Sequence, residues 1–213
     1  MKKVFLIMML IFAISMFSIN FGGGGYKISF IPKDQVNQIN PLKNTTFGDL
    51  ILHGGGGMGV MPNGSYLGGE GFGGSTTSGD FMIIKGVGNF IFGRHINIFN
   101  VLGIDVGMGI GGGETVIKRK VESSRNGKTI SDFENNINSV PYVVELKREE
   151  LSISPRVTLH INMIEFLSII LEGRFTYNYS PENWKIEGEY PITEKLPNYN
   201  YYYSFGAGVM WGF

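Results

Sequence analysis

The chain has 213 residues, of which 43% are hydrophobic, and its 18 basic residues balance 18 acidic ones. This apolar content excludes a disordered chain, and the balanced charge provides no basic surface for a nucleic-acid partner. The absence of cysteine excludes a disulfide framework, thiolate metal ligands and a cysteine nucleophile.

The first 20 residues have the layout of a Sec signal peptide. A short basic segment, MKK, precedes an uncharged apolar stretch from Val4 to Phe17, and the small residues that fit a cleavage site best are Ala13 and Ser15, with Ser18 as an alternative. The stretch is shorter than the roughly 17 to 25 residues that a membrane-spanning helix needs. We therefore expect a signal peptide over 1–20 and a single β-barrel domain over 21–213, with an uncleaved membrane helix as the alternative. No later apolar run approaches spanning length.

After Gly22 the dominant period is two residues, which is typical of β-strands with two different faces. Runs of Gly, Pro, Asn and Asp mark the turns between the alternating segments. Most segments match the roughly 9 to 11 residues with which a tilted strand crosses a bilayer. The pattern predicts eight strands, at 22–31, 48–61, 65–75, 81–92, 98–112, 149–162, 166–179 and 200–213.

The connections between these segments alternate in length. Short turns are predicted at 62–64, 93–97 and 162–165, and long loops at 32–47, 113–148 and 180–199. The loop at 76–80 is short although it lies on the long-loop side. An even number of strands with long loops on one end and short turns on the other is typical of bacterial outer-membrane barrels. The predicted fold class is all-β, a closed antiparallel transmembrane β-barrel of about eight strands.

The apolar face of the strands distinguishes two kinds of barrel. A soluble lipocalin-like barrel turns this face inward, whereas a transmembrane barrel turns it toward lipid. Here aromatic residues concentrate near the strand ends, as they do in the girdles at lipid interfaces. The predicted girdles are Tyr26, Phe30, Tyr177, Tyr179, Tyr201 and Tyr203 at the long-loop end, and Phe90, Phe92, Trp211 and Phe213 at the short-turn end.

The C-terminal strand carries a further signal. Apolar residues occupy alternate positions back from the terminal residue, at Phe213, Trp211, Val209, Ala207 and Phe205. This pattern resembles the sorting and assembly signal of outer-membrane β-barrel proteins. The resemblance implies the lipid bilayer and the barrel-assembly machinery as partners, with Phe205, Val209, Trp211 and Phe213 as the signal residues. It also implies the outer membrane of a diderm bacterium, with a secreted or periplasmic location as the alternative.

Charged residues of both signs alternate with the apolar face and are predicted to line the lumen. Charges inside a closed barrel must pair or stay hydrated, and eight strands enclose a space that side chains can just fill. A plugged or very narrow lumen is therefore expected. The predicted charge network consists of Lys27, Glu70, Lys85, Asp105, Arg156, Glu172 and Arg174.

The histidines offer no clear catalytic or metal site in the sequence. His95 falls in a predicted turn, and His53 and His160 fall on the predicted polar face without a third ligand. A triad of Ser154, His160 and Glu172 is disfavoured, because six residues along a strand separate Ser154 from His160 by roughly 20 Å. No catalytic residue, metal or cofactor is predicted.

The sequence therefore predicts a non-enzymatic outer-membrane barrel with a structural or interaction role, or a narrow pore for small solutes. One alternative is a secreted lipocalin-like barrel that binds a hydrophobic ligand. The other is a membrane-embedded, lipid-modifying enzyme. The two G-x-G-x-x-G segments, at 54–59 and 107–112, are attributed to the high glycine content, since no amphipathic helix follows either of them.

Overall fold

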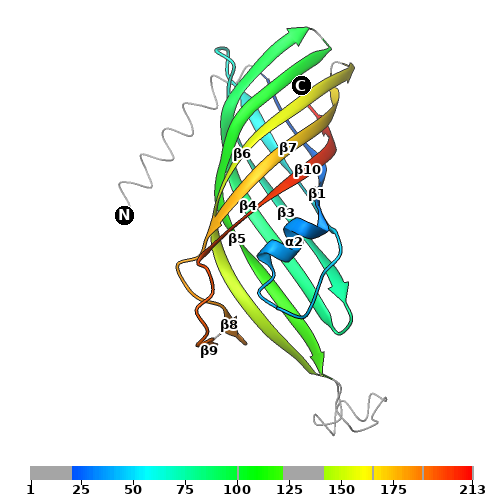
Figure 1. Cartoon of the computed structure of the whole chain (residues 1–213). Helices are drawn as coiled ribbons and strands as arrows, with labels where there is room; N and C mark the ends of the chain where they lie inside the picture. Colours follow the sequence, from blue (N-terminus) through cyan, green and yellow to red (C-terminus); the bar gives the residue numbers. More distant parts are fainter. Residues whose placement is uncertain (1–20, 100, 122–141, 165, 189, 213) are drawn as a thin grey trace, which may run out of the picture.

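A computed structural model describes residues 21–99, 101–121, 142–164, 166–188 and 190–212. The predicted signal peptide, Phe213 and the centre of the 113–148 loop lie outside these residues. Figure 1 shows one barrel with its loops gathered at one end. Eight strands form the wall: β1 (Phe21–Ile31), β2 (Leu50–Val60), β3 (Ser65–Ser78), β4 (Phe81–Phe99), β5 (Leu102–Val121), β6 (Tyr142–Ile164), β7 (Leu167–Tyr179) and β10 (Tyr199–Trp211).

The wall closes on itself without a free strand edge. Each strand pairs antiparallel with its neighbours in the order β5-β4-β3-β2-β1-β10-β7-β6, and β5 also pairs with β6. Closure satisfies the backbone groups of all eight strands within the wall, which is the condition for a sheet to lie in lipid. The predicted fold class, a closed antiparallel barrel of eight strands, is confirmed.

Several strand ends differ from the sequence prediction. The predicted turn at 93–97 is wrong, because β4 continues through these residues to Phe99 and pairs Arg94 with Val106 and His95 with Asp105. Asn and His are common in turns, but here the polar residues alternate in and out and extend the strand. At the other end, β5 and β6 extend into the predicted 113–148 loop, to Val121 and from Tyr142. Two short strands, β8 (Lys185–Ile186) and β9 (Tyr190–Pro191), lie in the loop between β7 and β10.

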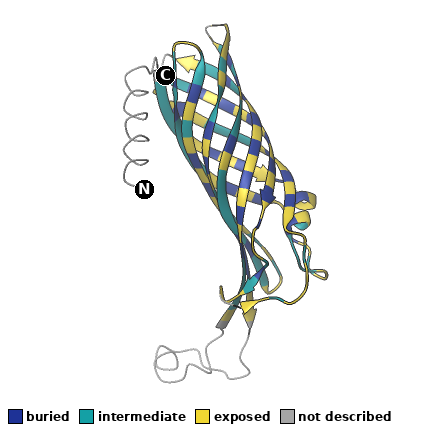
Figure 2. Cartoon of the chain, turned by 90° about the vertical axis from the view of Figure 1, so that its left-hand side faces the viewer, coloured by how far each residue is buried: buried dark blue, intermediate teal, exposed yellow. Residues whose placement is uncertain are grey.

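The exterior of the barrel is apolar and its interior polar. Along β7, buried and exposed residues alternate without a break, and Figure 2 shows the same checkered pattern around the wall. The exposed set on β7 includes Leu171 and Phe175, whereas the buried set includes Glu172 and Arg174. A soluble barrel would show the reverse, so the lipocalin-like alternative is wrong. The protein is an integral β-barrel of the outer-membrane class, and the outward face contacts lipid. No helix among the described residues is long and apolar enough to cross a membrane.

An apolar cluster fills the long-loop end of the lumen. Helix α2 (Lys33–Ile39) follows β1, and its Val36 and Ile39 are buried against inward residues of the wall and against Trp184 from the loop after β7. Gln35 fixes the helix to β10, because its side-chain oxygen accepts a hydrogen bond from the backbone N–H of Tyr203 (3.2 Å). A second buried apolar cluster lies toward the short-turn end and consists of Met58, Val60, Tyr66, Ile91, Ile170 and Met210.

Inward glycines make room for long side chains in the narrow lumen. A methyl group on Gly107 would overlap the Tyr66 hydroxyl and the backbone carbonyl of Phe92. Gly71 differs, because it faces outward and a methyl group there would meet only the Val87 carbonyl oxygen, at 3.7 Å. Glycine is therefore required at such inward positions because a larger side chain would collide with its neighbours.

Replacing Gly107 by Ala should lower the free energy of unfolding by about 1–3 kcal/mol, as overpacking of a dense core does. Gly71→Ala is the matched control and should change it by less than about 0.5 kcal/mol. Urea unfolding in detergent micelles, followed by tryptophan fluorescence, measures both. Equal stabilities for the two variants would contradict the packing described here.

Candidate functional site

The charged lumen residues form three separate clusters along the barrel axis. The central cluster consists of Lys27, Glu70, Arg156, Glu172 and Arg174. Glu70 contacts Arg156 and Arg174 at 2.7 Å each, and Lys27 at 3.4 Å. Glu172 contacts Arg174 at 2.5 Å, and both Lys27 and Arg156 at 3.4 Å. Two carboxylates thus hold three cations together where water is excluded, since all five side chains are buried.

The loop-side cluster surrounds Glu150 beneath the apolar plug. Its carboxylate contacts Lys85 at 2.7 Å and Arg148 at 2.8 Å, and it accepts a hydrogen bond from Asn200 at 2.8 Å. The Arg148 guanidinium also stacks on the Trp184 ring, 4.6 Å from its centre. The plug and the charged interior are therefore joined through one arginine.

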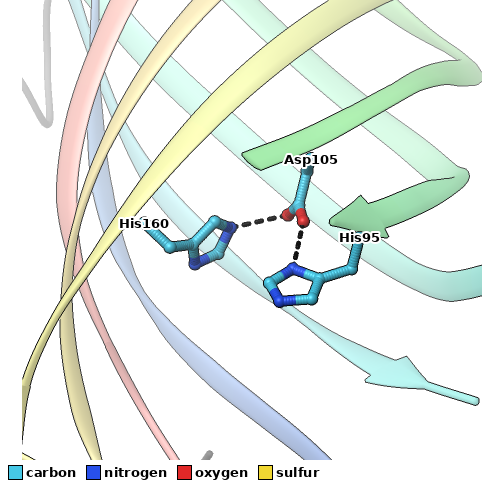
Figure 3. A group of neighbouring side chains, drawn as sticks. All are labelled: His95, Asp105 and His160. Carbon is cyan, nitrogen blue, oxygen red and sulfur yellow. Dashed lines mark hydrogen bonds and ion pairs between the residues drawn. The ribbon is translucent and has the colours of Figure 1, made fainter. Parts of the chain in front are cut away.

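The turn-side cluster consists of His95, Asp105 and His160 and lies near the short-turn end. Asp105 is buried and its two carboxylate oxygens contact different imidazoles: Oδ1 lies 2.6 Å from His95 Nδ1, and Oδ2 lies 2.6 Å from His160 Nε2 (Figure 3). Asn97 lies 3.1 Å from the other ring nitrogen of His95 through its Oδ1 atom. One carboxylate thus positions two imidazoles that face each other edge-on.

Strand register explains how three distant residues meet. The three residues come from β4, β5 and β6, which are consecutive in the wall. His95 lies directly opposite Asp105, and His160 lies opposite Gly103, two residues before Asp105 on the same face of β5. Because all three residues face the lumen, their side chains converge without any loop. The site is therefore built on rigid strands.

The three members of the turn-side cluster differ in exposure. The side chain of His95 is 9% exposed, compared with 1% for Asp105 and 3% for His160. His95 therefore forms the outer edge of the cluster, and the carboxylate lies behind it. This arrangement can act in two ways. A carboxylate that orients an imidazole supports acid–base chemistry, and a set of two imidazoles and one carboxylate can hold a metal ion.

The structure divides the predicted charge network. All seven predicted residues are buried in the lumen, but Lys85 belongs to the loop-side cluster and Asp105 to the turn-side cluster. The sequence analysis omitted Arg148 and did not connect either His95 or His160 with Asp105. The period of two places these residues on one face, but only the register between strands shows which of them meet.

Two expectations about the histidines are wrong. His95 is not in a solvated turn but in β4, with its side chain against Asp105. His53 faces outward rather than into the lumen, and its Nδ1 lies 2.6 Å from the Tyr26 hydroxyl. The glycines that follow His53 carry no side chains from which the inward face of β2 could be predicted. Leu50 and Leu52 point inward, so His53, the next residue, points outward.

The hydroxyls considered for a triad have other partners. Ser154 donates to Thr176 at 3.2 Å, and Thr158 donates to Glu172 at 3.2 Å. His160 pairs with Asp105 rather than with Glu172. The site therefore offers an acid–imidazole pair without a side-chain hydroxyl bonded to it among the contacts described.

The structure places the predicted girdle residues on the exterior. Tyr26 lies in the middle of β1 rather than at the long-loop end, whereas Tyr177, Tyr201 and Tyr203 lie at that end. Trp211 lies at the short-turn end of β10, whereas Phe90 and Phe92 lie in the middle part of β4 rather than at that end. Of the predicted assembly signal, Phe205, Val209 and Trp211 are exposed on the outer face of β10, and Phe213 lies outside the described residues.

No protein-family model and no curated protein matches the chain. Among solved structures, the chain is similar to the crystal structure of the outer membrane protease OmpT from Escherichia coli. The match has a TM-score of 0.40 and 9% sequence identity, and it covers 92% of this chain and 95% of the protease.

The expectation of a non-enzymatic barrel has this match against it, because the matched protein is an outer membrane protease. At 9% identity the match assigns no activity to this chain, so the function is argued below from the chain's own side chains.

Replacing Glu172 by Gln should destabilise the barrel by about 3–5 kcal/mol, because three buried cations would then share one carboxylate. Glu194→Gln is the matched control: its pair with Lys43 is 59% and 78% exposed, and its loss should cost less than about 1 kcal/mol. Unfolding midpoints in detergent measure both. A stable Glu172→Gln variant would show that the central cluster does not hold the lumen together.

Proposed function

We propose that the protein is a membrane-embedded hydrolytic enzyme whose catalytic centre is the turn-side cluster. The observation that supports this proposal is the buried Asp105 carboxylate with an imidazole 2.6 Å from each oxygen. Unlike the two other clusters, which pair carboxylates with lysine and arginine, this one contains imidazoles, which can both accept and donate a proton. Acid–base catalysis needs such groups, held in a fixed orientation.

The chemistry is general-base hydrolysis by water. Asp105 orients the imidazoles, and one of them takes a proton from a water molecule as that oxygen attacks a carbonyl carbon. The bond from this carbon to the leaving oxygen or nitrogen then breaks, and the imidazolium returns the proton to the leaving group. Water is the nucleophile because Ser154 and Thr158 donate to Thr176 and Glu172.

The surroundings of the site favour a lipid substrate. Large apolar side chains lie on the strand ends and turns around the turn-side cluster, beside the exposed polar residue Asn97. Exposed apolar patches of this kind mark contact with lipid or with an apolar ligand. An ester or amide of an amphipathic molecule fits such surroundings better than a soluble solute does. The patch consists of Ile96, Ile98, Phe99, Val101, Met163, Ile164 and Phe166, each between 42% and 69% exposed.

The barrel-assembly machinery is proposed as the partner during biogenesis. Phe205, Val209 and Trp211 form an alternating apolar row on the exposed face of β10, which closes the barrel against β1. This row supports recognition of the last strand before closure. The partner of the mature protein is the lipid bilayer.

His160→Ala should abolish hydrolysis, with a loss of at least about 100-fold, the usual contribution of a general base. The assay presents the folded protein with vesicles of glycerophospholipids and acylated lipids and measures released fatty acid. His53→Ala removes a histidine from the lipid-facing wall and should retain full activity. An inactive wild type, or equal rates for wild type and His160→Ala, would contradict the proposal.

Phe166→Ser should slow hydrolysis of lipids in vesicles at least several-fold while leaving hydrolysis of a soluble short-chain ester unchanged. Phe166 is 61% exposed in the patch and touches neither histidine in the described contacts. Its replacement should therefore affect the binding of lipid and not the chemical step. The ratio of the two rates is the measurement. An equal fall in both rates, or no change in either, would be evidence against a lipid substrate.

A further inference from the structure

We propose that the turn-side cluster binds one divalent transition-metal ion, with zinc as the best match, through His95 Nδ1, His160 Nε2 and the carboxylate of Asp105. The catalytic role of the ion rests on the proposed hydrolase, whereas its binding does not. The metal was not expected from the sequence, because His95 and His160 are 65 positions apart and His95 fell in a predicted turn.

The donor set carries the proposal. One ligand atom from each of the three residues lies within 4.8 Å of the other two. Among the described residues, His95, Asp105 and His160 are the group of histidines and acidic residues close enough together to hold a metal ion. Zinc with bonds of about 2.0–2.1 Å spaces neighbouring ligand atoms about 3.3 Å apart. Each imidazole nitrogen lies 2.6 Å from one oxygen of Asp105, and no two of the three ligand atoms are more than 4.8 Å apart. Small side-chain rotations therefore suffice to admit an ion.

The identity of the donors selects the ion. Two imidazoles and one carboxylate are the ligands of zinc and of neighbouring divalent transition metals. Calcium and magnesium instead require mostly oxygen donors, and calcium needs six or more of them. The turn-side cluster should therefore discriminate strongly against both.

Neighbouring residues prepare His95 for this role. Asn97 Oδ1 accepts a hydrogen bond from the Nε2–H of His95, which leaves Nδ1 facing Asp105. Partners of this kind set the orientation and tautomer of metal-binding histidines. Gly103 makes space for the ring, because a Cβ atom there would lie 2.7 Å from Cε1 of His95. The imidazole therefore sits in a cradle that a larger residue would fill.

The position of the cluster suits a reactive metal centre. Three protein ligands leave a coordination position for water or substrate, as in catalytic zinc sites. His95 is the most exposed member of the set and forms its outer edge. With an ion bound, His95 and His160 would act as ligands, and the ion would replace the imidazole general base by lowering the pKa of bound water toward neutrality.

Isothermal titration of the folded, chelator-stripped barrel with zinc chloride tests the site, and cobalt absorption spectroscopy reports its ligands. We expect one equivalent to bind with a Kd at or below the micromolar range. Calcium and magnesium should not compete. His95→Ala and His160→Ala should weaken binding at least about 100-fold, and Asn97→Ala about 10-fold. The lipid-facing variant His53→Ala should bind as the wild type does.

Gly103→Ala keeps all three ligands but fills the cradle, so it should weaken binding even where the ligand variants fold poorly. Heat-modifiable gel migration checks the fold of each variant. Absence of stoichiometric binding in the wild type, or unchanged affinity in His160→Ala, would overturn the metal site. Binding without any hydrolysis would uphold the metal site and overturn the proposed hydrolase. Hydrolysis by a protein that binds no metal would do the reverse.

Discussion

Closure of an eight-stranded sheet in lipid forces every second side chain into a narrow lumen. Because bulk water cannot hydrate that space, each charge must be neutralised by another side chain. Glu70 and Glu172 do this for the three central cations, and Glu150 does it for Lys85 and Arg148. The rest of the structure depends on this pairing, because an unpaired buried charge would destabilise the closed barrel.

The same constraint distinguishes the turn-side cluster. In the other two clusters, arginine and lysine neutralise the carboxylates permanently, and their contacts fix the interior. Asp105 instead faces two imidazoles, whose charge depends on protons or on a metal ion. We therefore expect a reaction at the turn-side cluster, where the carboxylate faces imidazoles instead of lysine and arginine.

The period of two, together with the loop lengths, predicted the strand number, the antiparallel closure and the outward apolar face. These features follow from local alternation, which a single sequence carries. The turn at 93–97 was wrong because Arg94, His95 and Asn97 resemble turn residues, whereas pairing with β5 extends the strand through them. His53 was placed on the wrong face because the glycines that follow it give no alternation to count.

The candidate site was beyond the reach of the sequence for a different reason. Asp105 was recognised as a lumen charge, but its partners lie on neighbouring strands 10 and 55 positions away. Which inward residues meet depends on the register of β4, β5 and β6. Alternation does not encode this register, and a shift by two residues would preserve every inward face while separating the three side chains.

Crystals of the barrel soaked in zinc and measured at the zinc absorption edge would test the account most directly. The account predicts one strong anomalous peak between His95, Asp105 and His160, with the His95 ring still hydrogen-bonded to Asn97. A peak at other residues alone, or none in the lumen, would contradict the assignment of the turn-side cluster as the reactive centre.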